Sequence, residues 1–261
     1  MSIVTISLIQ TRTFWHAPAR NREHLQGFFA DVPATSALLL LPEMFSTGFT
    51  MQPELVAETM QGPTAVWLGA QAKRQGRAIG GSAVVEVEGR YFNRFLLAHD
   101  DAEPQTYDKR HCFRMAGEHD HYTAGRTRPV WTVQSLRVRP SICYDLRFPI
   151  WLRRRNDYDL LVCVANWPAV RLSAWHTLLK ARAIENQSFV AGVNILGTDG
   201  NGVDYAGGSV VFGPDGRCLL DAANQEGVFS VQLDLKELTQ YRQDFPAWQD
   251  ADGFNVIDAE S

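Results

Sequence analysis

Short apolar runs recur along the chain, and polar, glycine or proline residues bound each of them. Runs of this kind between turn signals are typical of buried β-strands. The pattern predicts strands over residues 3–9, 37–41, 78–87, 91–98, 130–133, 138–143, 160–164, 189–193 and 208–212.

Several segments between these runs have the 3.6-residue periodicity of amphipathic helices. They cover residues 20–30, 64–75 and 172–187. Alternation of helices and strands predicts an α/β fold. Turn residues between apolar runs at 84–91 and 212–217 predict antiparallel hairpins as well. The sequence therefore predicts mixed sheets and disfavours a purely parallel, doubly wound sheet.

Length and composition favour one domain. A chain of 261 residues, 45% of them hydrophobic, is long enough to bury roughly 70–75% of the surface that its unfolded form exposes. No fixed-period repeat, low-complexity tract or flexible linker divides it. We expect a single domain over residues 1–261, in which only a tail from about Gln249 is loosely ordered.

Charge and hydropathy argue against two classes of partner. The net charge is -4, and the arginines at 153–155 are not continued by a basic stripe with aromatics, so we expect no nucleic-acid partner. No run approaches the 18 apolar residues of a membrane helix. Four cysteines without CxxC spacing, and a start without a signal-peptide pattern, predict a reduced, cytoplasmic protein.

The stretch SICYDLRFP, residues 141–149, places Cys143 where an apolar strand ends. A turn follows, and then a helix that begins near Phe148 and Pro149. Such an elbow exposes a side chain above the sheet edge, where nearby cations or a helix N-terminus could lower the thiol pKa. A cysteine on an apolar strand is more often a small buried hydrophobe, which is how we interpret Cys163. Cys143 differs because polar residues follow it.

Two further residues are candidates for chemistry. Glu43 in LLLLPEMF follows a buried strand, at the edge where α/β proteins bind ligands, and apolar neighbours would raise its pKa toward the range of acid-base catalysis. Lys109 in YDKRH is one of only 4 lysines beside 21 arginines, and an ammonium is the more compact donor. Each could instead be a solvated surface residue.

Together the three residues resemble the Glu-Lys-Cys catalytic set of the nitrilase superfamily. The resemblance extends to about Phe245 and rests on LPEMF, YDKRH, AGEHDHYTAG, SICYDLRFP, ANWP and ARAIENQ. It implies a four-layer αββα sandwich, a homodimer formed through the helical face, and no cofactor or metal. CYDLRFP, ANWP and ARAIENQ are most similar to the omega-amidase branch, which hydrolyses the terminal amide of small 2-oxo dicarboxylic acid monoamides such as 2-oxoglutaramate and 2-oxosuccinamate.

The resemblance also implies roles. Cys143 is the nucleophile, and Glu43 takes its proton, protonates the leaving ammonia and then activates water. Lys109 and the backbone N–H of Tyr144 hold the oxyanion. Glu118, in AGEHDHYTAG, supports catalysis near the lysine, unless it is a solvated loop carboxylate.

An omega-amidase must also hold the free carboxylate of its substrate, for which arginine has the best geometry. Arg147 could do so, or could pair with Asp145. Arg171, just after ANWP, is the second candidate. Trp167 could form an apolar wall of the site or belong to the dimer core.

Three other interpretations remain open. One is another enzyme of the superfamily, such as a deaminated glutathione amidase, a carbamoylase or a nitrilase. A second is a metal-binding or regulatory protein, because His111, Cys112, His119 and His121 lie close in sequence, although their spacing matches no standard zinc motif. The third is a catalytically silent binding protein, which the presence of all three reactive residues disfavours.

Overall fold

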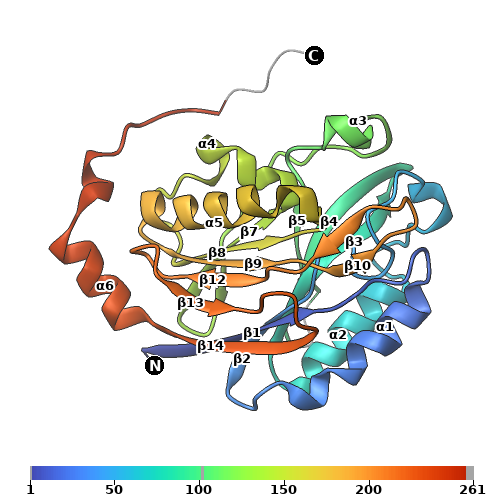
Figure 1. Cartoon of the computed structure of the whole chain (residues 1–261), viewed down its shortest axis with the longest axis horizontal. Coiled ribbons are helices and arrows are strands. Elements are labelled where there is room, and N and C mark those ends of the chain that lie inside the picture. The colour runs from blue at the N-terminus through green and yellow to red at the C-terminus, as the bar shows by residue number, and fades with distance from the viewer. Residues whose placement is uncertain (1, 101–102, 257–261) are drawn as a thin grey trace.

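The computed structural model describes residues 2–100 and 103–256, which include two six-stranded sheets (Figure 1). The first sheet contains, in spatial order, β14 (Gly227–Asp234), β1 (Ile3–Gln10), β2 (Ser36–Leu40), β3 (Ala78–Val87), β4 (Arg90–Ala98) and β5 (Gln105–Asp108). The second contains β13 (Cys218–Asp221), β12 (Val210–Phe212), β9 (Phe189–Val193), β8 (Leu160–Val164), β7 (Leu136–Ile142) and β6 (Trp131–Val133). A separate ribbon pairs β10 (Leu196–Thr198) with β11 (Asp204–Ala206).

Both sheets have parallel strands at the centre and antiparallel strands at the edges. In the first sheet β1, β2 and β3 are parallel, while β14, β4 and β5 join antiparallel. In the second sheet β7, β8 and β9 are parallel, while β6, β12 and β13 join antiparallel. The predicted mixed α/β fold is confirmed.

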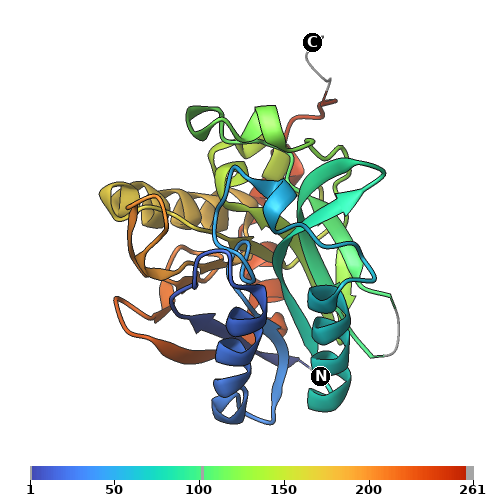
Figure 2. The same cartoon turned by 90° about the vertical axis from the view of Figure 1, so that its right-hand side faces the viewer.

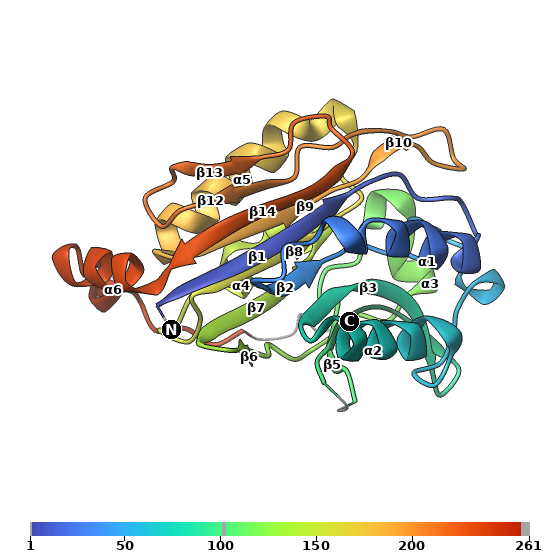
Figure 3. The same cartoon turned by 90° about the horizontal axis from the view of Figure 1, so that it is seen from below.

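The sheets pack face to face, and helices cover their outer faces (Figures 2 and 3). Strand β2 shows why, because alternate residues of a strand point to opposite faces. Leu38 and Leu40 belong to the core shared with the second sheet, whereas Leu39 packs with residues of α1 (Pro18–Gly27) and α2 (Pro63–Gln75). Helix α5 (Leu172–Asn186) covers the second sheet. The result is the four-layer αββα sandwich that the resemblance implied.

The predicted elements agree with the structure in different degrees. Strands β3, β8 and β9 have the predicted bounds, and α2 and α5 differ by one residue. Helix α1 begins earlier than predicted because Pro18 suits a first helical turn. Strand β7 ends at Ile142, so Cys143 follows the strand instead of ending it. Strands β5, β10, β11, β13 and β14 and helix α6 (Leu235–Asp244) were not predicted.

The remaining helices are short: α3 (Glu118–His121) and α4 (Pro149–Leu152), the latter beginning where the sequence predicted. In the predicted tail no helix or strand follows Asp250 among the described residues, and 257–261 lie outside them. None of the helices in the described ranges is both long and apolar enough to cross a membrane.

Candidate active site

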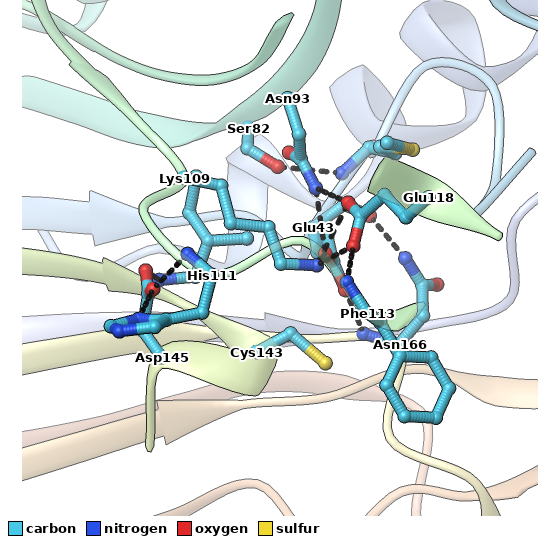
Figure 4. A network of polar contacts seen from close by, with 12 residues as sticks. Glu43, Ser82, Asn93, Lys109, His111, Phe113, Glu118, Cys143, Asp145 and Asn166 are labelled. Atoms are coloured by element: carbon cyan, nitrogen blue, oxygen red, sulfur yellow. Dashed lines mark hydrogen bonds and ion pairs between the residues drawn. The ribbon is translucent and has the colours of Figure 1, made fainter. Parts of the chain in front are cut away.

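Residues that follow four strands meet at one edge of the sandwich (Figure 4). Glu43 lies shortly after β2, Lys109 directly after β5, and Cys143 directly after β7. Asn166 follows β8 and donates its backbone N–H to Glu43 Oε2 at 2.7 Å. The structure thus brings together the three residues that the sequence singled out, from both sheets.

Lys109, Glu43 and Glu118 form a buried ion cluster, here named the lysine cluster. Lys109 Nζ donates to Glu43 Oε1 at 3.0 Å and to both carboxylate oxygens of Glu118 at 2.9 Å. The side chain of Lys109 is 1% exposed and those of both glutamates are 0% exposed. The alternative interpretation of these residues as solvated surface charges is therefore wrong.

Two asparagines that the sequence reasoning did not assign complete the cluster. Asn93 Nδ2 donates to Glu43 Oε1 at 2.8 Å and to Glu118 Oε1 at 3.3 Å, and Asn166 Nδ2 donates to the Glu43 carbonyl at 2.8 Å. A signal for Asn93 was present, because it shares the inward face of β4 with apolar Phe95. A polar residue at such a position usually has a buried partner.

The lysine cluster has one ammonium for two carboxylates. Burial lowers the pKa of Lys109, but the charges of Glu118 and Glu43 outweigh burial and hold that pKa well above its usual value. Lys109 therefore remains a cation. Burial raises the pKa of Glu118, which the lysine charge only partly offsets. The cluster is a place where a carboxyl can hold a proton more easily than in water.

Cys143 begins a 3-10 helix, Cys143–Arg147, with a φ of 44°. Burial and the neighbouring Glu43 charge raise the pKa of its thiol well above the usual value, and Lys109 opposes this rise only in part. The expectation of a lowered thiol pKa is wrong for the free protein, because burial and the Glu43 charge outweigh the charge of Lys109. A base must therefore take the proton when Cys143 reacts. Cys163 is fully buried, as expected.

The thiol opens on a cavity of about 690 Å³. Lys109, Cys143, Tyr144 and Asn166 line it, together with an apolar wall that includes Trp167. Trp167 is 3% exposed, and its indole N–H donates to the carbonyl of Arg171 at 2.8 Å. Trp167 is thus a wall of this cavity.

Arg147 and Arg171 both line the cavity. Arg147 does not pair with Asp145; its guanidinium lies 5.0 Å from the ring centre of Trp167. The guanidinium of Arg171 lies 5.7 Å from the ring centre of Phe113. Within the described residues neither arginine forms an ion pair. Two guanidinium groups therefore line the cavity without being paired to a carboxylate of the described residues.

The four residues considered as metal ligands have other roles or lie apart. His111 Nδ1 lies 2.8 Å from Asp145 Oδ1, and Cys112 Sγ donates to the carbonyl of Tyr122 at 3.7 Å. In the part of the chain that the structure describes, no three His, Cys, Asp or Glu side chains are grouped to hold a metal ion. The metal-binding interpretation has no structural support.

Comparison with known proteins places this geometry in a family context. Residues 5–243 match the family described as carbon-nitrogen hydrolase. The chain is 42% identical over 252 residues to the omega-amidase YafV of Escherichia coli K12, covering 96% of this chain and 98% of that protein. It is 31% identical over 252 residues to the 2-oxoglutaramate amidase of Bacillus subtilis strain 168, covering 94% and 96%.

Among solved structures, XC1258 from Xanthomonas campestris superposes with a TM-score of 0.95 at 43% identity, covering 98% of this chain and 100% of that one. It is described as a CN-hydrolase superfamily protein with an arsenic adduct in its active site. The similarity covers nearly the whole chain, and the matched range 5–243 includes the segments that carry the lysine cluster.

Proposed function

The chain belongs to the carbon-nitrogen hydrolase family, and on that premise we propose that it hydrolyses the terminal amide of small 2-oxo dicarboxylic acid monoamides. 2-Oxoglutaramate and 2-oxosuccinamate are the substrates proposed, and acid and ammonia the products. The observation that carries the proposal is the Cys143 thiol, which opens on a cavity beside the lysine cluster. Similarity to an omega-amidase and a 2-oxoglutaramate amidase supports the substrate class.

In the first half of the proposed reaction, Glu43 takes the proton of the Cys143 thiol and the sulfur attacks the amide carbon. The carbonyl oxygen becomes an oxyanion, which Lys109 Nζ and the N–H of Tyr144 stabilise. The carbon–nitrogen bond then breaks, and Glu43 returns the proton to the leaving nitrogen, so that ammonia departs. The raised pKa of the thiol explains why a base is needed, and the raised pKa of Lys109 keeps its charge available.

In the second half, water hydrolyses the thioester on Cys143. Glu43 takes a proton from the water, the hydroxide adds to the carbonyl carbon, and the same two donors hold the second oxyanion. The carbon–sulfur bond breaks, and the proton returns to the sulfur as the acid leaves. Glu118 supports both halves by holding Lys109 Nζ with two carboxylate oxygens.

Specificity is proposed to come from Arg147 or Arg171, because a substrate carboxylate would supply the anion that both lack in the described structure. Trp167 would bound the same space on its apolar side. Replacing the substrate carboxylate by its methyl ester should lower kcat/KM by roughly 10- to 100-fold, because a charged hydrogen-bonded pair is lost with an arginine that is exposed (Arg147) or half-buried (Arg171) in the free protein. Arg147→Lys and Arg171→Lys, made separately, would identify the anchor, since lysine keeps the charge and loses the two-pronged geometry. Equal kcat/KM for acid and ester would remove the substrate assignment.

The nucleophile is tested by Cys143→Ala, with Cys163→Ala as the control for loss of a neighbouring sulfur. Ammonia release from 2-oxoglutaramate should vanish in the first variant and persist in the second. Rapid quenching of the wild-type reaction should also give a mass increase on the peptide that contains Cys143, as expected for a thioester. Ammonia release by Cys143→Ala at the wild-type rate would end the covalent mechanism.

We also propose that the chain acts as a single domain, residues 1–261, in a cytoplasmic homodimer. One core shared by both sheets and a family match over 5–243 support the single domain. Ile150 and Ile184, on α4 and α5 of the helical face, are 60% and 46% exposed, which supports a covered surface there. Four free cysteines support a reducing compartment.

A further inference from the structure

One buried carboxylate connects the two segments that carry the proposed oxyanion donors. Asp145 is 0% exposed and accepts four hydrogen bonds from the described residues. From the segment of Lys109 it accepts the hydroxyl of Tyr107 at 2.7 Å, and the backbone N–H and ring Nδ1 of His111 at 2.9 and 2.8 Å. From the segment of the nucleophile it accepts the backbone N–H of Ile142 at 3.1 Å. The contacts of His111 with Asp145 are visible in Figure 4.

These bonds hold the chain on both sides of each donor. Lys109 lies midway between the two residues of its own segment that reach Asp145. Tyr144 lies between Ile142 and Asp145, which are joined by the fourth bond. Oxyanion donors must keep their positions to within about 0.5 Å to be effective. A single acceptor bound to both segments therefore controls the spacing between the two donors.

The local backbone shows why such a link is needed. Cys143 has a φ of 44°, a sparsely populated region for a residue other than glycine, which persists only where neighbouring contacts hold it. The bond from Ile142 to Asp145 spans this residue. Tyr144 is the second residue of the 3-10 helix, so its N–H lies outside the intrahelical hydrogen bonds. The carboxylate therefore stabilises the turn that presents this N–H.

From this geometry we infer that Asp145 is a positioning residue, which sets the oxyanion hole by tying the Lys109 segment to the Tyr144 turn. The inference rests on the proposed function. Asparagine cannot replace it, because each carboxylate oxygen accepts a backbone N–H, from His111 or from Ile142. Whichever oxygen becomes an NH₂ group would face a donor that cannot accept.

The test is Asp145→Asn, assayed for ammonia release from 2-oxoglutaramate. The expected kcat is roughly 10²- to 10³-fold lower, as when one oxyanion donor is lost. KM should stay within about threefold, because donors that act in the transition state change kcat and leave substrate binding intact. This division between kcat and KM separates positioning from a general loss of structure.

Asp159→Asn is the matched control. Asp159 is also a buried aspartate, and it accepts hydrogen bonds from Arg137 and Arg242 at 2.7 Å each. It lies directly before β8, whereas Asn166 of the site lies after the other end of that strand. This variant should lower the melting temperature and leave kcat unchanged. If Asp145→Asn loses no more kcat than Asp159→Asn at an equal loss of melting temperature, the inference is overturned and the amidase remains.

A wild-type protein that hydrolyses no amide would overturn both the inference and the proposed function. If Asp145→Asn does not fold, Tyr107→Phe removes one of the four bonds and should lower kcat at unchanged KM, whereas wild-type kcat in that variant would count against Asp145.

Discussion

Two ion clusters lie at opposite ends of β8, and the ratio of cations to carboxylates in one is the inverse of the ratio in the other. In the lysine cluster, one ammonium is shared by Glu43 and Glu118. In the other, named the arginine cluster, one carboxylate, Asp159, is shared by Arg137 and Arg242, each with a contact of 2.7 Å. Both are built from short, charged hydrogen bonds. The lysine cluster adjoins the cavity that Cys143 opens on, and the arginine cluster does not contact it.

The difference in ratio decides how each carboxyl titrates. Burial raises the pKa of Glu118. The charge of Lys109, which Glu118 shares with Glu43, lowers that pKa only in part. Burial also raises the pKa of Asp159, but hydrogen bonds and charges from two guanidiniums outweigh burial and lower it. Burial alone therefore does not predict a proton-transfer site. An excess of buried carboxylates raises the pKa of a carboxyl, which can then hold a proton, whereas an excess of arginines lowers that pKa and keeps the carboxyl ionised.

The largest expected effect is on turnover. Glu43→Gln should lower kcat by roughly 10²- to 10⁴-fold through loss of the base, and Lys109→Met by roughly 10²- to 10³-fold through loss of an oxyanion donor. Because the two act as a unit, the double variant should fall little below the worse single variant. Arg242→Met should keep wild-type kcat. Ammonia-release kinetics measure all four variants, and independent, multiplicative losses would contradict a shared site.

The next effect is on stability. Asp159→Asn should lower the free energy of unfolding by about 2 kcal/mol, because it weakens the charged hydrogen bonds from Arg242, whose side chain is 11% exposed, and from Arg137, whose side chain is 40% exposed. Glu118→Gln should cost about 1 kcal/mol or less, because relief of repulsion between two carboxylates offsets the lost hydrogen bond. Urea denaturation at neutral pH measures both. Equal losses would mean that the inverted charge ratio has no energetic consequence.

The smallest effect is the pH dependence, which should have opposite signs in the two clusters. The lowered pKa of Asp159 gives a stabilisation that is complete above the usual aspartate pKa and is lost as the pH falls through the lowered value. The raised pKa of Glu118 gives a contribution that is complete below the usual glutamate pKa and is lost as the pH rises through the raised value.

Urea titrations at several pH values would measure the stability of the wild type relative to each variant. Relative to Asp159→Asn, the wild-type advantage should shrink at low pH. Relative to Glu118→Gln, it should shrink as the pH rises. If the stability difference between wild type and variant changed with pH in the same direction for both variants, the clusters would not differ in the way that their charges imply.

The sequence predicted those parts of the fold that each depend on one apolar run. Strand β14 was missed because it has no continuous apolar run. Its residues Phe229, Val231 and Leu233 alternate with polar residues, and only Leu233 in this strand is fully buried. Helix α6 was missed although Asp234 caps it by accepting the N–H of Lys236 at 2.8 Å. In both cases the local signal existed without a continuous apolar run.

The residues of the site also divide into those that a local stretch of sequence reveals and those that it does not. Glu43, Lys109 and Cys143 were found because each carries reactive chemistry in a recognisable stretch of sequence. The four bonds of Asp145 span up to 38 residues of chain, and no local pattern specifies such a meeting. The sign of the Cys143 pKa shift was wrong for a related reason. It depends first on burial of the thiol and then on the charges of Glu43 and Lys109, which come near it only when both sheets are assembled.

The pairing of β1 with β14 has a consequence for biosynthesis. Ile3 to Gln10 find their antiparallel partner in Asp234 to Gly227, and Ser7 bonds to Ser230 across 223 residues of chain. At typical translation speeds the ribosome needs roughly 10 to 45 seconds to make that interval. Until then one long edge of β1 has no neighbour, and such an edge invites pairing with other chains. The geometry therefore predicts that the nascent polypeptide is more prone to aggregate before β14 is made than after it.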